Sequence, residues 1–158
     1  MTRRIHIPVS AKDQGGMSLI EVLVSVLVLG VGLLGVAAMQ SLALRGGQSS
    51  LETSQAVMAS SSILEAIRAN PTQASSYNMA KTCTVPSGGT LVTNDKAAWI
   101  TSLKSTIGSG VATDTTTCGQ ISNCSATTVC KVTVFWNDAR GGADNGGAAR
   151  KLDVETRI

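Results

Sequence analysis

The chain has 158 residues, of which 43% are hydrophobic and 15% charged, and its formal net charge is +3. A charge this small provides no basic stripe, which argues against nucleic acid as a partner. Aromatic residues make up only 3% of the chain, so any folded domain in it has a modest core.

Residues 1–16 form a short basic leader without an apolar core. A secretory signal would place its hydrophobic region before the cleavage site, whereas here that region follows a pair of glycines. Cleavage after Gly16 would keep the apolar segment on the mature chain and expose a new amine on Met17. It would also remove His6, leaving 10 basic and 9 acidic side chains and a net charge of about +1.

The next segment has the length of a membrane span and carries one carboxylate at its start. Residues 22–44 are 23 residues without a charged side chain, and about 20 helical residues cross a bilayer. Glu21 precedes them, one helical turn beyond Met17. An acidic residue in a membrane costs about 2.5–3.5 kcal/mol, so Glu21 either reaches the interface or has a partner. The basic leader predicts that residues 1–16 face the cytoplasm and that the remainder is exported.

Residues 16–24, which read GMSLIEVLV, resemble the class III signal of type IV prepilins and type II secretion pseudopilins. Residues 17–40 most resemble minor pilins of the PilV type, the type IV pilus modification proteins. The likeness continues through residues 62–71 and, weakly, residues 133–138. The resemblance implies a pilin-like α+β fold, in which a long N-terminal helix, transmembrane and then amphipathic, packs on a small C-terminal antiparallel β-sheet.

The same resemblance implies how the chain is processed and assembled. Prepilin peptidase would cleave between Gly16 and Met17 and then methylate the new amine of Met17. Glu21 would pair with the N-terminal amine of a neighbouring subunit and set its register. The implied partners are other minor pilins, the major pilin, the inner-membrane assembly platform and a tip adhesin. We therefore expect a single-pass protein of the bacterial inner membrane, with a periplasmic C-terminal domain, that enters the assembled pilus.

The helix is expected to continue beyond the membrane, because Leu51, Met58 and residues 63–67 return at helical intervals. Asn70-Pro71 should end it, since the residue before proline avoids the helical region. An amphipathic half needs a cover for its apolar stripe, which the following residues can supply. The expected parts are a leader (1–16), a transmembrane and polymerisation helix (17–44), an amphipathic half-helix (45–70) and a periplasmic globular domain (71–158).

Glycines at two places could bend or soften this long helix. Gly46-Gly47 is a plausible bend just beyond the membrane. Gly30, Gly32 and Gly35 are either ordinary glycines of a membrane helix or a softened segment that extends when the subunit enters a fibre.

A second, shorter helix is predicted in the exported part. Thr93-Asn94 is a candidate N-cap. Trp99, Leu103 and Ile107 follow at i, i+4 and i+8, and Gly108 is a stop signal.

Two strands follow. Residues 129–136 and 151–158 alternate apolar and polar side chains, which predicts an antiparallel sheet with one buried face. The inward positions are Cys130, Val132, Val134, Trp136, Leu152, Val154 and Ile158. The glycine-rich residues 137–149 are predicted to be a mobile loop. The Ser- and Thr-rich residues 113–128 are predicted to be loop or a weak edge strand.

All four cysteines, Cys83, Cys118, Cys124 and Cys130, follow the membrane segment. Two disulfides are the simplest interpretation for a small exported domain. Three connectivities are possible, and we favour Cys118–Cys124 with Cys83–Cys130. A zinc site is the alternative, but six-residue steps do not match the spacing of zinc-ligand pairs.

The sequence offers little support for an enzymatic function. No catalytic triad, zinc-protease motif or phosphate loop is present, and no histidine remains after processing. Asp138, Asp144 and Asn145 offer oxygen ligands for calcium, but their spacing fits no known calcium loop and a solvated loop is favoured. We therefore expect a protein without a cofactor or metal.

Two classes of function remain after these exclusions. The first is a fibre subunit: a minor pilin that primes pilus assembly, or alternatively a type II secretion minor pseudopilin. The second is a single-span anchored binding module that never polymerises. Gly16 and Glu21 discriminate between the classes, because an anchored module has no use for either residue.

Overall fold

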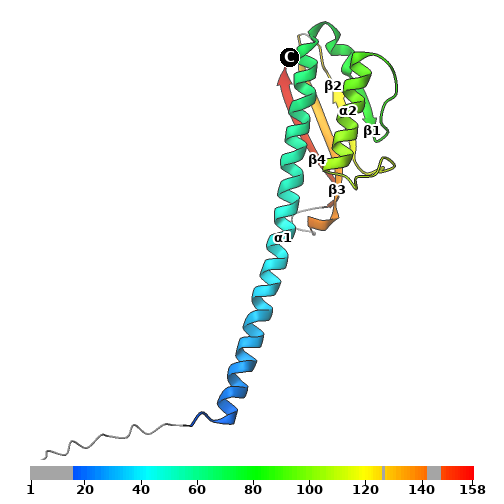
Figure 1. The fold of residues 1–158 in the computed structure, drawn as a ribbon. Helices are drawn as coiled ribbons and strands as arrows, with labels where there is room; N and C mark the ends of the chain where they lie inside the picture. Colours follow the sequence, from blue (N-terminus) through cyan, green and yellow to red (C-terminus); the bar gives the residue numbers. More distant parts are fainter. Residues whose placement is uncertain (1–15, 126, 142–146) are drawn as a thin grey trace, which may run out of the picture. The chain divides into compact units, whose positions relative to one another are not determined.

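The computed structural model describes residues 16–125, 127–141 and 147–158. They form two compact units, one ending at Gln40 and the other spanning Ser41–Ile158. A long N-terminal helix is followed by a short helix and a four-stranded antiparallel sheet (Figure 1). This pilin-like α+β arrangement confirms the predicted fold class.

The first helix, α1 (Leu19–Ala69), is continuous. It includes Gly46 and Gly47, so the helix is not interrupted at the expected bend. It ends where the sequence predicted, because Asn70 leaves the helical region with φ −131° and Pro71 opens a short 3₁₀ helix, η1 (Pro71–Tyr77). The helix stop at Asn70-Pro71 is therefore confirmed.

The side of α1 that faces the core is not the side with the largest apolar residues. Leu51 and Met58 are 57% and 62% exposed, so the prediction that they belong to the covered stripe is wrong for both. The buried residues of α1 are Ser49, Glu52, Ala56, Ser60, Ile63, Leu64 and Ile67. Several are small, and the Ser60 hydroxyl donates to the carbonyl of Ala56 at 2.8 Å. Small side chains allow a helix to lie close to a neighbouring element, and a search for large apolar residues does not detect them.

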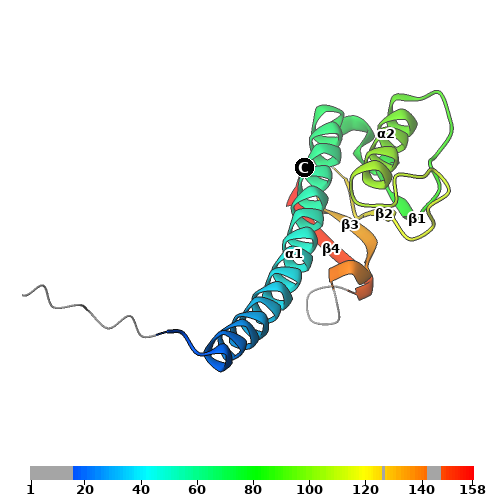
Figure 2. The same ribbon diagram turned by 60° about the horizontal axis from the view of Figure 1, so that its bottom comes forward.

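The sheet has the order β1-β2-β3-β4, with every neighbouring pair antiparallel. Its strands are β1 (Met79–Thr82), β2 (Cys118–Ser122), β3 (Val129–Asp138) and β4 (Gly147–Arg157). The residues of α1 beyond Ser41 and the second helix cover one face of the sheet (Figure 2). The predicted alternation of β3 and β4 is confirmed, because Cys130, Val132, Val134 and Trp136 are buried in this core.

Two predictions about the connections are wrong. Residues 118–122 are neither loop nor edge, because β2 pairs with β1 on one side and β3 on the other. Residues 137–149 are not one loop, since β3 extends to Asp138, Ala139–Gly141 is a 3₁₀ turn, and β4 begins at Gly147. Pairing with neighbouring strands holds β2, the end of β3 and the start of β4 in the sheet.

The second helix, α2 (Leu91–Thr106), begins earlier than predicted. Its N-cap is Thr90, whose hydroxyl accepts from the Thr93 N–H at 3.2 Å while the Thr93 hydroxyl accepts from the Thr90 N–H at 3.1 Å. This reciprocal capping places Thr93 inside the first turn and not at the cap. The predicted end is confirmed, because the Gly108 N–H donates to the Leu103 carbonyl at 3.2 Å.

Trp99 of α2 lies directly over Gly119 of β2. A Cβ built on Gly119 would approach Trp99 ring atoms more closely than 3.0 Å and lie 2.8 Å from Cδ1 of Ile100. The close approach of the indole to the sheet therefore requires glycine at this position.

We expect Gly119→Ala to lower the free energy of unfolding by about 1–3 kcal/mol, because the added methyl group must displace a packed indole. Urea unfolding of the full chain in detergent micelles, followed by tryptophan fluorescence, measures this. Gly46→Ala is the matched control: a Cβ there meets nothing within 4 Å, so this variant should be neutral or more stable by up to about 1 kcal/mol. Equal stability of Gly119→Ala and the parent chain would contradict the packing argument.

The four cysteines form two disulfides, Cys83–Cys118 and Cys124–Cys130. The pairing favoured from the sequence, Cys118–Cys124 with Cys83–Cys130, is therefore wrong. Cys118 opens β2 and Cys124 follows its end, and four extended steps already separate Cys118 from Ser122 by about 13 Å. Bonded cysteines have Cα atoms within about 7 Å, so Cys118 bonds to Cys83, which follows the neighbouring strand β1.

A buried polar cluster joins α1 to the facing ends of β3 and β4. The Ser49 hydroxyl donates to Oδ2 of Asp138 at 2.6 Å, and Nη1 of Arg150 donates to the same oxygen at 3.0 Å. Nη1 of Arg150 also lies 2.7 Å from the Ser49 oxygen. Asp138 is 1% exposed, so its charge is balanced by an arginine in direct contact. The cluster fixes the position of α1 at one end of the sheet.

Candidate functional site: the start of the first helix

The proposed cleavage point, between Gly16 and Met17, lies just before α1 begins at Leu19. Gly16 and Met17 are exposed and lie before α1. A Cβ built on Gly16 meets nothing within 4 Å, so no contact within the described chain requires glycine at this position. Leader residues 1–15, including His6, lie outside the described residues.

Glu21 lies in the first turn of α1. The carbonyl of Ser18 accepts from the N–H groups of Glu21 and Val22 at 3.0 and 3.3 Å, and this closes the first turn. A carboxylate in the first turn is favourably placed relative to the helix dipole. Glu21 is exposed, so its carboxylate is accessible to a group outside the chain.

The part of α1 that follows Glu21, residues 22–44, exposes large apolar side chains on all sides. α1 is the one helix in the described residues long and apolar enough to cross a membrane, with a mean hydropathy of 2.7 in its most apolar window and none of that window buried. Leu19 and Leu34 are 79% and 73% exposed. A helix apolar all round needs lipid or other helices around it. The start of α1 thus combines an accessible carboxylate with an uncovered apolar surface.

Comparison with known proteins identifies this segment. Residues 11–37 match the family described as the prokaryotic N-terminal methylation motif. The match covers 27 of the 158 residues and contains Gly16, Met17 and Glu21. No curated protein and no solved structure matches the chain.

The methylation motif supports a type IV pilin-like or pseudopilin protein. It implies processing by prepilin peptidase and a link to the pilus assembly machinery, and with the apolar helix it supports anchoring in a membrane. Proteins with this motif are structural rather than enzymatic. The motif thus explains the region of the chain where the accessible carboxylate and the apolar helix meet.

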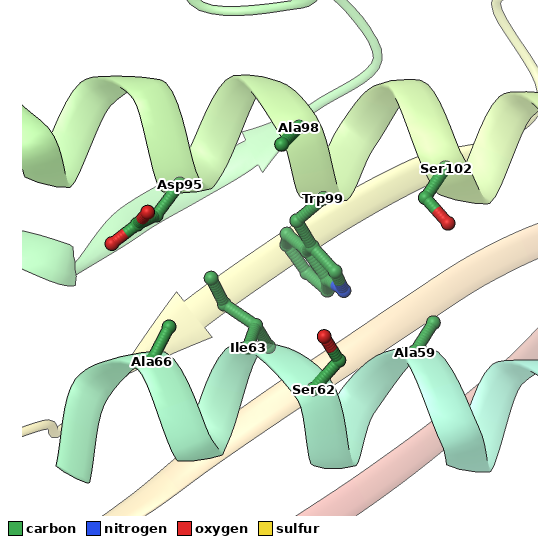
Figure 3. Close-up of a pocket in the computed structure, with 8 residues that line it drawn as sticks. All are labelled: Ala59, Ser62, Ile63, Ala66, Asp95, Ala98, Trp99 and Ser102. Carbon is green, nitrogen blue, oxygen red and sulfur yellow. The ribbon is translucent and has the colours of Figure 1, made fainter. Parts of the chain in front are cut away.

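The C-terminal unit contains a cleft between α1 and α2 that the sequence did not indicate. Figure 3 shows Trp99 reaching from α2 towards α1 between small side chains of both helices. The cleft has a volume of about 280 Å³, with Ala59, Ser62 and Ala98 in its walls. Alanine and serine at these positions leave space beside the indole. The sequence prediction relied on the spacing of large apolar residues, and that spacing does not predict this cleft.

Of the three oxygen ligands considered for calcium, Asp138 is the one that lies in the described part of the chain. Asp138 is engaged by Ser49 and Arg150, while Asp144 and Asn145 lie outside the described residues. Within residues 16–125, 127–141 and 147–158, no group of three or more His, Cys, Asp or Glu residues could hold a metal ion.

Proposed function

We propose that this chain is a minor pilin of the PilV type, which helps to prime assembly of a type IV pilus. The observation that carries the proposal is the methylation motif over residues 11–37, with Glu21 at the start of an uncovered apolar helix. In this proposal the chain leaves the inner membrane with its C-terminal domain in the periplasm and enters the pilus near its tip. Adhesion and twitching motility would then depend on it.

The proposed parts of the chain have separate tasks. Residues 1–16 are the leader, residues 17–44 span the membrane and polymerise, residues 45–70 carry the globular domain, and residues 71–158 form that domain. Glu21 pairs with the amine of Met17 from a neighbouring subunit, because opposite charges attract strongly among apolar helices. The proposed partners are prepilin peptidase, the assembly platform, the major pilin, other minor pilins and a tip adhesin.

A type II secretion minor pseudopilin is the second candidate, because the methylation motif serves both systems. Two disulfides in the exported part and the likeness of residues 17–40 to pilus modification proteins favour the pilus. An anchored binding module, the third candidate, has no need for the junction at Gly16 or for Glu21.

The mass of the intact protein tests the proposal. The chain would be extracted from membranes of cells that contain prepilin peptidase, and its N-terminal fragment sequenced. We expect a chain that begins at Met17, with one added methyl group on the amine. A chain that still begins near Met1 would support a plain membrane anchor and contradict the pilin function.

Glu21→Val is expected to leave processing intact but to prevent incorporation into the fibre. Breaking a buried ion pair costs about 3–5 kcal/mol, which corresponds to a loss of more than a hundredfold in the incorporation equilibrium. Immunoblots of sheared pili and of membranes measure the two populations.

Glu65→Val is the matched control, since Glu65 lies on the same helix, is exposed and pairs with Arg68 within the chain. It should enter fibres normally. Normal incorporation of Glu21→Val would exclude the pairing role.

A further inference from the structure

The face of the sheet opposite the helices carries a cavity at one end. The cavity has a volume of about 400 Å³, and its walls come from β1, β3, β4 and the segment before β2. Lys81, Thr115, Thr116, Phe135 and Lys151 line it, together with the Cys83–Cys118 disulfide. We call it the Phe135 site. A cavity of this size is within the range of small-molecule binding sites.

The Phe135 site has an excess of positive charge. Lys81, Arg150 and Lys151 line it, and no acidic residue is among its described lining residues. Arg150 contacts the buried Asp138. Asp153 lies 3.7 Å from Nζ of Lys151 but is closer, at 3.3 Å, to Lys131. Lys81 and Lys151 therefore present two exposed ammonium groups at the cavity, to which an anionic group can bind.

The floor of the site is apolar and fixed by the sheet. Phe135 pairs in register with Cys118 on β2 and with Lys151 on β4. Directly opposed residues of antiparallel strands have their Cβ atoms about 4.5–5.5 Å apart. Nζ of Lys81 lies 4.2 Å from the centroid of the Phe135 ring. The Lys81 ammonium therefore lies over the face of the Phe135 ring, and Lys151 lies opposite Phe135 on β4.

The rim of the site carries hydroxyl groups on a well-held turn. Oδ1 of Asp114 accepts from the N–H and the hydroxyl of Thr116, both at 2.7 Å, and Oδ2 accepts from the Thr117 hydroxyl at 2.6 Å. Burial of Asp114 opposes its ionisation, but the hydrogen bonds from Thr117, Thr116 and Ser109 outweigh burial and hold its pKa below the usual value. Asp114 therefore remains ionised near neutral pH and positions Thr115 and Thr116 at the rim.

We propose that the Phe135 site binds an acidic saccharide of the uronic acid type. On binding, the exposed Lys81 side chain turns from the Phe135 ring to the ligand, so that the carboxylate lies between Lys81 and Lys151. The C–H face of the sugar ring then packs on Phe135 and the disulfide, and ring hydroxyls bond to Thr115 and Thr116. A bare anion would use only the lysines, and a neutral sugar would use only the floor and the rim. This assignment does not depend on whether the chain polymerises.

The test is a titration of the mature full chain in non-ionic detergent micelles with tri-galacturonic acid, followed by calorimetry at low ionic strength. Maltotriose and inorganic phosphate serve as the neutral-sugar and bare-anion probes. We expect saturable binding of tri-galacturonic acid, weakened by salt because the lysines are exposed. We expect no saturable binding of maltotriose and at least tenfold weaker binding of inorganic phosphate.

Lys81→Gln and Lys151→Gln should each weaken binding of tri-galacturonic acid at least about tenfold, the effect of losing one charged hydrogen bond. Phe135→Leu should weaken it while leaving every charge in place. Arg157→Gln is the matched control: Arg157 is an exposed cation on the same face of β4, six residues and about 20 Å from Lys151. It should bind as the parent chain does.

Three results would overturn the proposal. The first is absence of saturable binding. The second is equal binding of inorganic phosphate and tri-galacturonic acid, which would mean that the site recognises charge alone. The third is an equal effect of Arg157→Gln and Lys151→Gln, which would mean that the whole strand attracts anions without a defined site. The lysine substitutions alter exposed side chains, so the outcome does not depend on whether Phe135→Leu folds.

Discussion

Gly16→Val should accumulate as the unprocessed precursor, sixteen residues longer than the mature chain, in cells that contain prepilin peptidase. A peptidase must bring its catalytic groups close to the scissile backbone, and a residue without a Cβ permits that approach. Position 16 has open space around it, so valine should not disturb the fold. Immunoblotting and intact mass measure the ratio of precursor to mature chain, and we expect the mature form to be nearly absent.

Gly47→Ala is the control for this experiment, because a Cβ built on Gly47 also meets nothing within 4 Å but this glycine lies inside α1. It should be processed at the normal rate. A mature-length band from Gly16→Val would place the junction elsewhere and remove the basis for methylation of Met17.

Asp138→Ala should cause a large loss of stability in the C-terminal unit. It removes the acceptor shared by Ser49 and Arg150, and it leaves a partly buried arginine without this carboxylate. Breaking such a pair costs about 3–5 kcal/mol. Urea unfolding of the full chain in micelles should show a midpoint shift of corresponding size.

Asp153→Ala is the matched control, because Asp153 lies on the same sheet and pairs with Lys131 in a more exposed setting. It should shift the midpoint only slightly. If the two variants unfold at the same urea concentration, the buried cluster contributes no more than a surface pair.

Local signals predicted the elements that depend on a few neighbouring residues. Asn70-Pro71 ends α1 because proline restricts the residue before it, and β3 and β4 were visible because their buried and exposed side chains alternate. The candidate site at the start of α1 could also be predicted from the sequence, because a carboxylate directly before 23 uncharged residues is rare.

Features that depend on distant partners were not predictable in this way. β2 is polar and short, and only its hydrogen bonds to β1 and β3 make it a central strand. The buried side of α1 is lined by Ser49 and Ser60 rather than Leu51 and Met58, because closeness to the sheet and hydrogen bonding decide burial there. The disulfide pairing followed from the antiparallel arrangement of β1 and β2, and the spacing of the cysteines could not reveal it.

The strand β4 ends the sheet, and among the described residues it pairs only with β3. Its outward side chains read Lys151, Asp153, Glu155 and Arg157 along the chain. A second copy laid antiparallel and centred on Val154 would oppose Asp153 to Glu155 and Lys151 to Arg157. A shift of the centre by one residue either way opposes Asp153 to itself or Glu155 to itself. Each of these alignments places at least one pair of like charges directly opposite each other. The eleven-residue edge of β4 can therefore be exposed at high local concentration, because pairing with the β4 edge of a second copy is disfavoured.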